Sequence, residues 1–276
     1  MAADFDSLWN YDDPAASEQK FRELLATTSD TNTALEIQTQ IARAQGLQRK
    51  FDDAHKTLDA VMTNSPRVEV RYLLERGRVF NSSGAKDKAR PLFLGAWEKA
   101  QQHKLDFFAV DAAHMMAIVS APDEALRWNE QAVALAEKST DPKAQDWIGS
   151  LLNNIGWTYY EKGEYAKALE LFERDRKWFE ERKRGEQTRI ALYSIGKTLR
   201  ALGRLDEALA TQRAIEKLSE DGYVFEEIAE CLLAAGRGDE ARSYFARAYE
   251  LLSRDQWLAA NEPKRLARLK ELSAAK

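Results

Sequence analysis

Side chains that commonly carry catalysis or bind metals are few in this sequence. Its 276 residues include three histidines, His55, His103 and His114, and one cysteine, Cys231. No histidine has a second histidine or a cysteine at metal-ligand spacing, so the sequence predicts no zinc or iron site. A glycine-rich phosphate loop, a Gly-x-Ser-x-Gly elbow and a His-Glu-x-x-His motif are also missing from it. We therefore expect no metal, no cofactor and no enzymatic activity.

The remaining reactive groups have structural explanations. Cys231 is followed by Leu232 and Leu233, an apolar setting that predicts a buried thiol rather than a nucleophile. Carboxylates are plentiful, but Lys and Arg lie three or four positions from them, as on the solvated faces of amphipathic helices.

The composition favours an all-α protein. Hydrophobic residues make up 44% of the chain, and Gly (13) and Pro (6) are scarce among good helix formers. The net charge of −4 argues against a nucleic-acid partner. Residues 1–14 lack the basic and apolar regions of a signal peptide, and no apolar run reaches the length of about eighteen residues that spans a membrane. We expect a cytoplasmic protein with neither a nucleic-acid nor a membrane partner.

A pair of small residues, twelve positions apart, recurs along the chain. The pairs are Ala42 and Ala54, Gly77 and Ala89, Ala113 and Ala125, Gly156 and Ala168, Gly196 and Ala208, and Ala229 and Ala241. Helix breakers between the members are Gly84, Pro122, Gly163, Gly203 and Gly236. Small residues let two antiparallel helices approach closely, so the pattern predicts a series of helix pairs.

This pattern resembles the tetratricopeptide repeat, a helix–turn–helix unit of about 34 residues. The best match is residues 151–172, LLNNIGWTYYEKGEYAKALELF. The resemblance implies an all-α, right-handed superhelical solenoid of antiparallel helix pairs with a capping helix at each end. It divides the chain into a lead segment and capping helix (1–29), six repeats (30–252) and a C-terminal capping helix (253–276). The repeats span about 34–66, 69–104, 105–138, 147–184, 188–220 and 221–252.

Two spacings between successive pairs are wide. The first members lie 35, 36, 43, 40 and 33 residues apart. The spacings of 43 and 40 leave room for extended second helices and for a longer connection at 139–147. Repeats extended in this way are similar to those of kinesin light chain-like and bacterial peptide-sensing proteins, and simple loop growth is the alternative.

Both ends of the chain carry signs of capping elements. Asp13 and Pro14 are suited to open a helix that runs to about Thr28, and Pro263 marks the start of an amphipathic helix near the C-terminus. An apolar cluster of Phe5, Leu8, Trp9 and Tyr11 precedes the first of these helices. Its aromatic residues either pin the lead segment onto the first repeats or fold back into the groove as an internal ligand.

In the resemblance, the first helices of the repeats form a concave binding groove. Residues three before, one after and four after the first small residue share the helix face that points into it. The predicted groove residues are Arg78, His114, Asn153, Trp157, Tyr160, Tyr193, Lys197 and Arg200, to which Asn154 is added from outside this rule. These types are enriched at binding hot spots. Packing of Trp157 and Tyr160 against a neighbouring repeat is the alternative.

Chaperone-binding members of the family clamp a C-terminal carboxylate with Lys, Asn and Arg from successive repeats. The matching positions in repeats one to three hold Thr39, Arg43, Glu75, Phe107 and Asp111, and those in repeats three to five hold Val110, His114, Asn154, Ile190 and Ser194. Among the latter, Asn154 alone keeps the required type, and Glu75 and Asp111 would repel a carboxylate. The sequence does not favour such a clamp.

The resemblance therefore predicts a scaffold that binds a peptide or protein segment in its groove. The basic and aromatic groove residues favour an acidic-apolar partner segment. An RNA-binding helical repeat and a peptide-responsive regulatory sensor of the bacterial type are the alternatives. We expect a monomer, with exchange of the lead segment as a route to dimers.

Overall fold

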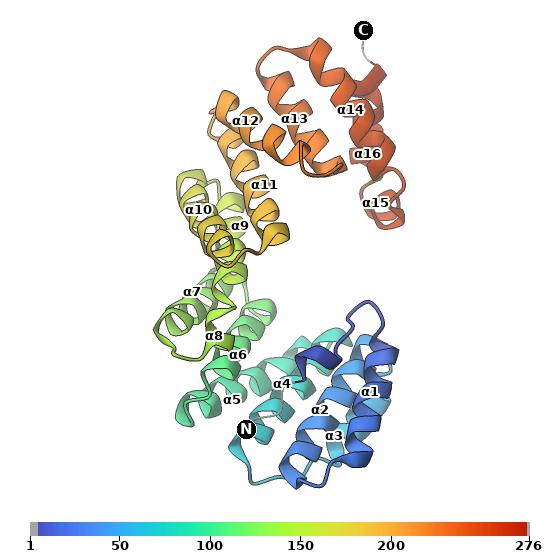
Figure 1. Cartoon of the computed structure of the whole chain (residues 1–276), viewed down its shortest axis with the longest axis vertical. Coiled ribbons are helices and arrows are strands. Elements are labelled where there is room, and N and C mark those ends of the chain that lie inside the picture. Colours follow the sequence, from blue (N-terminus) through green and yellow to red (C-terminus); the bar gives the residue numbers. More distant parts are fainter. Residues whose placement is uncertain (1–4, 275–276) are drawn as a thin grey trace. The chain divides into compact units, whose positions relative to one another are not determined.

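A computed structural model describes residues 5–274 of the chain. This part of the chain forms sixteen α-helices, one short 3₁₀ helix and no strand (Figure 1). Consecutive long helices are antiparallel and joined by short turns. The predicted all-α class and series of helix pairs are thereby confirmed.

The chain divides into two compact units between Leu151 and Leu152, inside helix α9. The elements of unit 1 are η1 (Asp6–Leu8), α1 (Pro14–Thr27), α2 (Thr31–Leu47), α3 (Phe51–Asp59), α4 (Pro66–Ser82), α5 (Lys86–Gln102), α6 (Asp106–Val119), α7 (Pro122–Lys138) and α8 (Pro142–Gln145). After α9 (Ile148–Glu161), the helices of unit 2 are α10 (Tyr165–Glu181), α11 (Gly185–Ala201), α12 (Leu205–Glu216), α13 (Gly222–Ala234), α14 (Gly238–Leu252), α15 (Gln256–Asn261) and α16 (Pro263–Ala274).

The recurring small residues lie where paired helices touch. A Cβ atom on Gly77 of α4 would stand 2.4 Å from Cε1 of Phe93 on α5. In unit 2, a Cβ atom on Gly156 of α9 would stand 2.6 Å from Cε1 of Phe172 on α10. Phe93 and Phe172 are fully buried, so each ring fills the space that the missing side chain leaves.

The turn between α9 and α10 shows how the predicted breakers end the first helices. Gly163 has φ 77°, a left-handed conformation that glycine adopts without steric cost. Its N–H donates to the carbonyl of Tyr160, and the N–H of Glu164 donates to the carbonyl of Tyr159. These two bonds satisfy carbonyl groups at the helix end and reverse the chain for α10.

The two wide repeat spacings have different structural origins. The connection at 139–147 contains the short helix α8, whose N-cap Asp141 accepts a hydrogen bond from the N–H of Lys143. The spacing of 40 residues instead reflects the first helix α11, which has 17 residues whereas α6 has 14. The second helices α5 and α10 both have 17 residues, so the extension falls on a first helix and not on a second helix as expected.

The ends of the chain pack as amphipathic helices. Asp13 caps α1 by accepting a hydrogen bond from the N–H of Ala16, and Phe21 of this helix is fully buried. Helix α16 begins at Pro263, as predicted, and buries Leu266 and Leu269 in the core of unit 2. The short helix α15, which the sequence did not indicate, precedes it.

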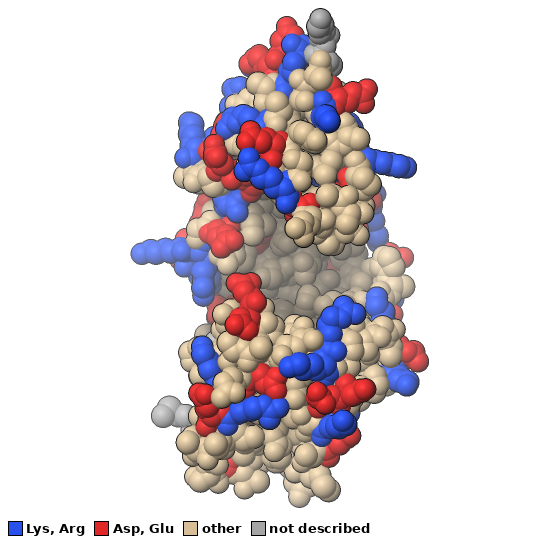
Figure 2. Space-filling view, turned by 90° about the vertical axis from the view of Figure 1, so that its right-hand side faces the viewer, with Lys and Arg blue, Asp and Glu red and all other residues tan. Residues whose placement is uncertain are grey.

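The surface and the core follow the predicted polarity. Basic and acidic side chains alternate over the face seen in Figure 2 rather than forming large patches of one sign. Cys231 is buried in unit 2, and burial raises the pKa of its thiol to about 12. No helix in the described part of the chain has the length and apolar character needed to cross a membrane.

Candidate functional site

An ion pair recurs between successive first helices. Its cation stands one residue after the small residue of one helix, and its carboxylate stands two residues before the small residue of the next. The three examples are Arg43–Glu75 at 3.6 Å, Arg78–Asp111 at 2.5 Å and Lys197–Glu227 at 3.5 Å. The first two lie in unit 1 and the third in unit 2. These positions therefore face the same side of each first helix.

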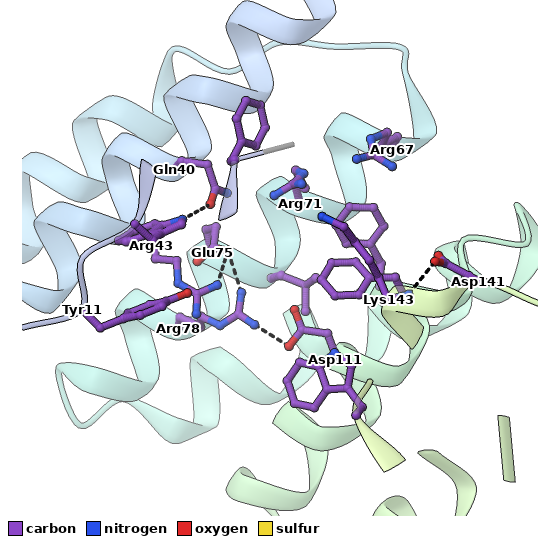
Figure 3. Close-up of a pocket in the computed structure, with 16 residues that line it drawn as sticks. Tyr11, Gln40, Arg43, Arg67, Arg71, Glu75, Arg78, Asp111, Asp141 and Lys143 are labelled. Atoms are coloured by element: carbon purple, nitrogen blue, oxygen red, sulfur yellow. Dashed lines mark hydrogen bonds and ion pairs between the residues drawn. The ribbon is translucent and has the colours of Figure 1, made fainter. Parts of the chain in front are cut away.

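In unit 1 this side of α2, α4 and α6 borders a cavity of about 330 Å³ (Figure 3). The cavity is lined by Phe5, Trp9, Tyr11, Gln40, Arg43, Arg67, Arg71, Leu74, Glu75, Arg78, Phe107, Phe108, Asp111, Asp141, Lys143 and Trp147. Five of these side chains are cationic and three are anionic, and Glu36, which pairs with two of the arginines from behind the wall, brings the local net charge to +1. The cavity is thus more basic than the chain as a whole, whose net charge is −4.

Arg78 joins two acidic side chains at the centre of the cavity wall. Its Nη1 lies 2.6 Å from Oε1 of Glu75 and its Nη2 lies 2.5 Å from Oδ1 of Asp111 (Figure 3). Burial acts to lower the pKa of the Arg78 guanidinium, but Asp111 and Glu75 outweigh it and raise that pKa above its ordinary value. Arg78 therefore holds α4 and α6 together while it contributes to the wall.

Two further arginines, Arg71 and Arg67, lie about two and three helical turns from Arg78 toward the N-terminus of α4. Nε of Arg67 and Nε of Arg71 each lie 2.8 Å from a carboxylate oxygen of Glu36 on α2. Both guanidinium groups also stand over the ring of Phe108 on α6, at 5.0 and 4.9 Å from its centroid. Burial lowers the pKa of Arg71, although Glu36 opposes the shift. These contacts fix two planar cations at the cavity wall.

The lead segment, residues 5–11, lies against the same side of α2 and α4. Phe5 is 3% exposed and packs with Phe21 of α1, while the guanidinium of Arg71 stands 5.2 Å from its centroid. Nε1 of Trp9 donates to Oε1 of Gln40 at 3.2 Å. The segment is therefore pinned to the core through Phe5 and lies along the first-helix side through Trp9.

His114, a predicted groove residue, is half-buried on α6. Its ring centroid lies 5.2 Å from that of Trp147, which also lines the cavity. Burial lowers the pKa of His114, although the charge of Asp111 opposes the shift. This environment favours a neutral ring. Among residues 5–274, no three His, Cys, Asp or Glu side chains converge as they would around a metal ion.

The seven other predicted groove residues lie in unit 2 and are all half-buried: Asn153, Asn154, Trp157 and Tyr160 on α9, and Tyr193, Lys197 and Arg200 on α11. The Trp157 ring makes edge contacts with Tyr160 and with the core residue Phe172, at 5.2 Å in each case. Nζ of Lys197 lies 5.8 Å from the centroids of both Trp157 and Tyr193. Burial raises the pKa of the Tyr193 hydroxyl. Trp157 thus packs on the core and also contacts its predicted neighbours.

The cations of this unit 2 group share one carboxylate. Nε and Nη2 of Arg200 donate to the two oxygens of Glu227 on α13 at 2.8 and 3.0 Å, and Nζ of Lys197 lies 3.5 Å from the same group. The side-chain amide oxygen of Asn153 is buried and accepts no hydrogen bond. The group is therefore aromatic and amide-rich, with two cations that share one carboxylate.

Sequence reasoning missed several residues of the unit 1 cavity as binding candidates. The sequence pattern places Arg43, Glu75 and Asp111 at the positions of a carboxylate clamp alone, and it does not indicate Arg67, Arg71 or Gln40. Arg67, Arg71 and Arg78 are separated by four and seven residues, so they share one helix face. Extending the groove rule one and two turns along α4 would have found them.

Comparisons with known proteins agree with this geometry. A family model described as tetratricopeptide repeat matches residues 39–103, 153–223 and 193–255, which is more than half of the chain. A second model with the same description matches residues 112–174. A comparison with curated protein sequences finds no match.

Several solved structures share the fold at low sequence identity. Apo NprR, a quorum sensor from B. thuringiensis, has 15% identity and a TM-score of 0.62 over 94% of this chain and 75% of its own. Apo RapI has 11% identity and a TM-score of 0.74 over 91% and 75%. A signal transduction ATPase with a tetratricopeptide repeat sensor from Pyrococcus horikoshii has 14% identity and a TM-score of 0.72 over 94% of this chain, which spans 41% of that protein's length. The family models, the helix pairs and the small residues at their contacts agree: the chain belongs to the tetratricopeptide repeat family.

Proposed function

We propose that this chain is an interaction scaffold that binds a peptide or a segment of another protein along its first helices. The observation that carries the proposal is the unit 1 cavity, which three successive first helices line with guanidinium groups and aromatic rings. Such groups supply large contact area together with hydrogen-bond donors, as binding hot spots do. NprR, which has a similar fold, is known in complex with its cognate peptide NprX, with a TM-score of 0.53 to this chain.

The charge of the cavity supports an acidic-apolar partner segment. With Glu36 counted, its cationic side chains exceed its anionic ones by one, and the rings of Phe107, Phe108 and Trp147 supply apolar wall. A carboxylate of the partner would reach Arg67, whose side chain is 31% exposed, more readily than the more enclosed Arg78 at 17%. The aromatic and amide group around Trp157 in unit 2 is proposed as a second contact surface for such a partner.

Selection of peptides from a random display library against the full chain tests the proposal. We expect enrichment of sequences that place Asp or Glu beside aromatic or aliphatic residues. Arg67→Gln should weaken binding of the selected peptides about tenfold, because a charge-assisted hydrogen bond is worth about 1.5–3 kcal/mol. Fluorescence anisotropy with labelled peptides gives the affinities.

Arg90→Gln is the matched control. Arg90 lies in the same unit on the second helix α5, where it pairs with Glu124 at 2.6 Å and does not line the cavity. Equal affinity of the two variants, or selected peptides without acidic residues, would remove the cavity as the binding site.

A further inference from the structure

The lead segment lies on two positions of α2, and the equivalent positions of α4 and α6 border the cavity. Gln40 and Arg43 stand two before and one after the small residue of α2, as Glu75 and Arg78 do on α4. Trp9 and Tyr11 lie against Gln40 and Arg43, and all four side chains line the same cavity as Glu75, Arg78 and Asp111. The chain itself therefore occupies the α2 part of this row of equivalent positions and forms one wall of the cavity that continues along α4 and α6.

Side chains of the lead segment hold it on Gln40 and Arg43 of α2, as the side chains of a bound peptide would. The guanidinium of Arg43 stands 5.5 Å from the Trp9 centroid and 5.8 Å from the Tyr11 centroid, and these two rings stack at 5.1 Å. The indole N–H is used by Gln40, so its polar atom is satisfied as well. Phe5, four residues before Trp9, fills an apolar site beside Phe21.

The outer part of the segment is loosely enclosed. Tyr11 is 60% exposed, and the residues from Asn10 to Asp13 are all exposed. Asn10 links the segment to α1, because its N–H donates to Oγ of Ser17 and its carbonyl accepts from the same hydroxyl. Release of Trp9 and Tyr11 would therefore leave α1 and its cap in place.

We propose that the lead segment is an internal ligand of the first-helix row, and that a partner segment binds by displacing it. The partner then carries two aromatic residues at the spacing of Phe5 and Trp9, and its acidic part continues into the cavity beside Arg67 and Arg71. This inference rests on the proposed function and adds the chemistry of the partner and the regulation of its access. A tethered segment competes at a high effective concentration, so the intact chain binds a free partner more weakly than a chain whose own segment is disabled.

The test uses a labelled peptide with the sequence of residues 5–13 as probe and the full chain as receptor. We expect weak binding to the wild type, binding at least about tenfold tighter to Phe5→Ala/Trp9→Ala, and an intermediate affinity for Trp9→Ala. Adding Arg43→Ala to the double variant should reverse the gain, because it removes the cation that stacks on the indole. Trp257→Ala, which changes an exposed tryptophan of α15, is the control and should bind as the wild type does.

Circular dichroism establishes that each variant is folded. Trp9→Ala keeps Phe5 in the core and carries the test by itself should the double variant unfold. Equal affinity of the wild type and the folded variants for the probe, or no binding to any of them, overturns the inference. Library-selected peptides that still depend on Arg67 in that case would leave the proposed function standing, so the two failures are distinguishable.

Discussion

The first-helix sides of the two units share an ion pair but differ in what surrounds it. In unit 1, Arg78 alone joins two carboxylates, on α4 and α6, and further arginines line the wall of a cavity. In unit 2, two cations on α11 converge on Glu227, and their neighbours are aromatic rings that also pack on the core. The same repeat position therefore supplies a cation held by two carboxylates in a wall with further arginines in unit 1, and a cation that shares one carboxylate with Arg200 in unit 2.

This difference shows that residue type at a groove position does not decide its role. Lys197 and Arg78 occupy equivalent positions, one residue after the small residue of a first helix. The carboxylates and cations within reach decide whether such a cation joins two carboxylates, as Arg78 does, or shares one with a second cation, as Lys197 does. A comparison of matched substitutions in the two units can test this.

The largest difference is expected in the free energy of unfolding when Arg78 in unit 1 and Lys197 in unit 2 are each replaced by methionine. Arg78→Met leaves the buried Asp111 without this partner and leaves Glu75 with the more distant Arg43, so it should lower the free energy of unfolding by about 3 kcal/mol. Lys197→Met should lower it by less than about 1 kcal/mol, because Glu227 keeps Arg200 and the lysine is partly solvated. Urea unfolding followed by circular dichroism measures both values, and similar costs would show that the two ion pairs are equivalent.

A second comparison concerns the close contact within helix pairs. Gly77→Ala should cost about 2 kcal/mol, because the new methyl group meets the buried ring of Phe93. Gly95→Ala, on the partner helix of the same pair, is the control and should cost nothing, since its nearest neighbour is Leu73 Cδ1 at 3.7 Å. Gly196→Ala in unit 2 meets the flexible side chain of Gln212 and should fall between them. The same unfolding measurements decide the order.

Unit 2 also contains a buried carboxylate with an oxygen that accepts no hydrogen bond, unlike the arginine-bound carboxylates of unit 1. Asp175 on α10 is 1% exposed, its Oδ1 accepts no hydrogen bond, and burial raises its pKa to about 7. Between about pH 4 and 7 the folded state holds a proton that the unfolded state releases, so stability falls as the pH rises through this window. Asp175→Asn should therefore be more stable than the wild type by about 1–2 kcal/mol at about pH 8, with the difference vanishing toward about pH 4.

Thermal or urea unfolding across this pH range measures the effect. Glu170→Gln, which replaces an exposed carboxylate on the same helix, serves as the control and should show no comparable dependence. A constant difference between Asp175→Asn and the wild type at all pH values would contradict the account.

The smallest effect is expected in the rate at which a thiol reagent labels Cys231 in the folded chain. Because burial raises its pKa to about 12, iodoacetamide should label it only on unfolding of unit 2. Labelling rates of the Arg78→Met and wild-type chains then separate the stability of the two units. Rapid labelling of the folded wild type would show that the core around Cys231 opens readily.

Much of the fold could be predicted because its signals are local. The twelve-residue spacing, the breaker at Gly163 and the capping pair at Asp13 and Pro14 each act within one or two helices. The candidate site was predicted less completely. Arg78 follows from its place beside Gly77, but the sequence pattern indicates Arg43 for a carboxylate clamp alone.

The sequence by itself determined that the chain is a series of helix pairs, because helix periodicity, small contact residues and turn residues are encoded within each repeat. Only the tertiary structure decided which cations are compensated, since the partners of an ion pair such as Arg67 and Glu36 lie 31 residues apart on different helices. It also decided that the lead segment lies along the first-helix row. That placement depends on the Trp9 indole meeting Gln40 and Arg43, which belong to α2 and share no local sequence pattern with Trp9.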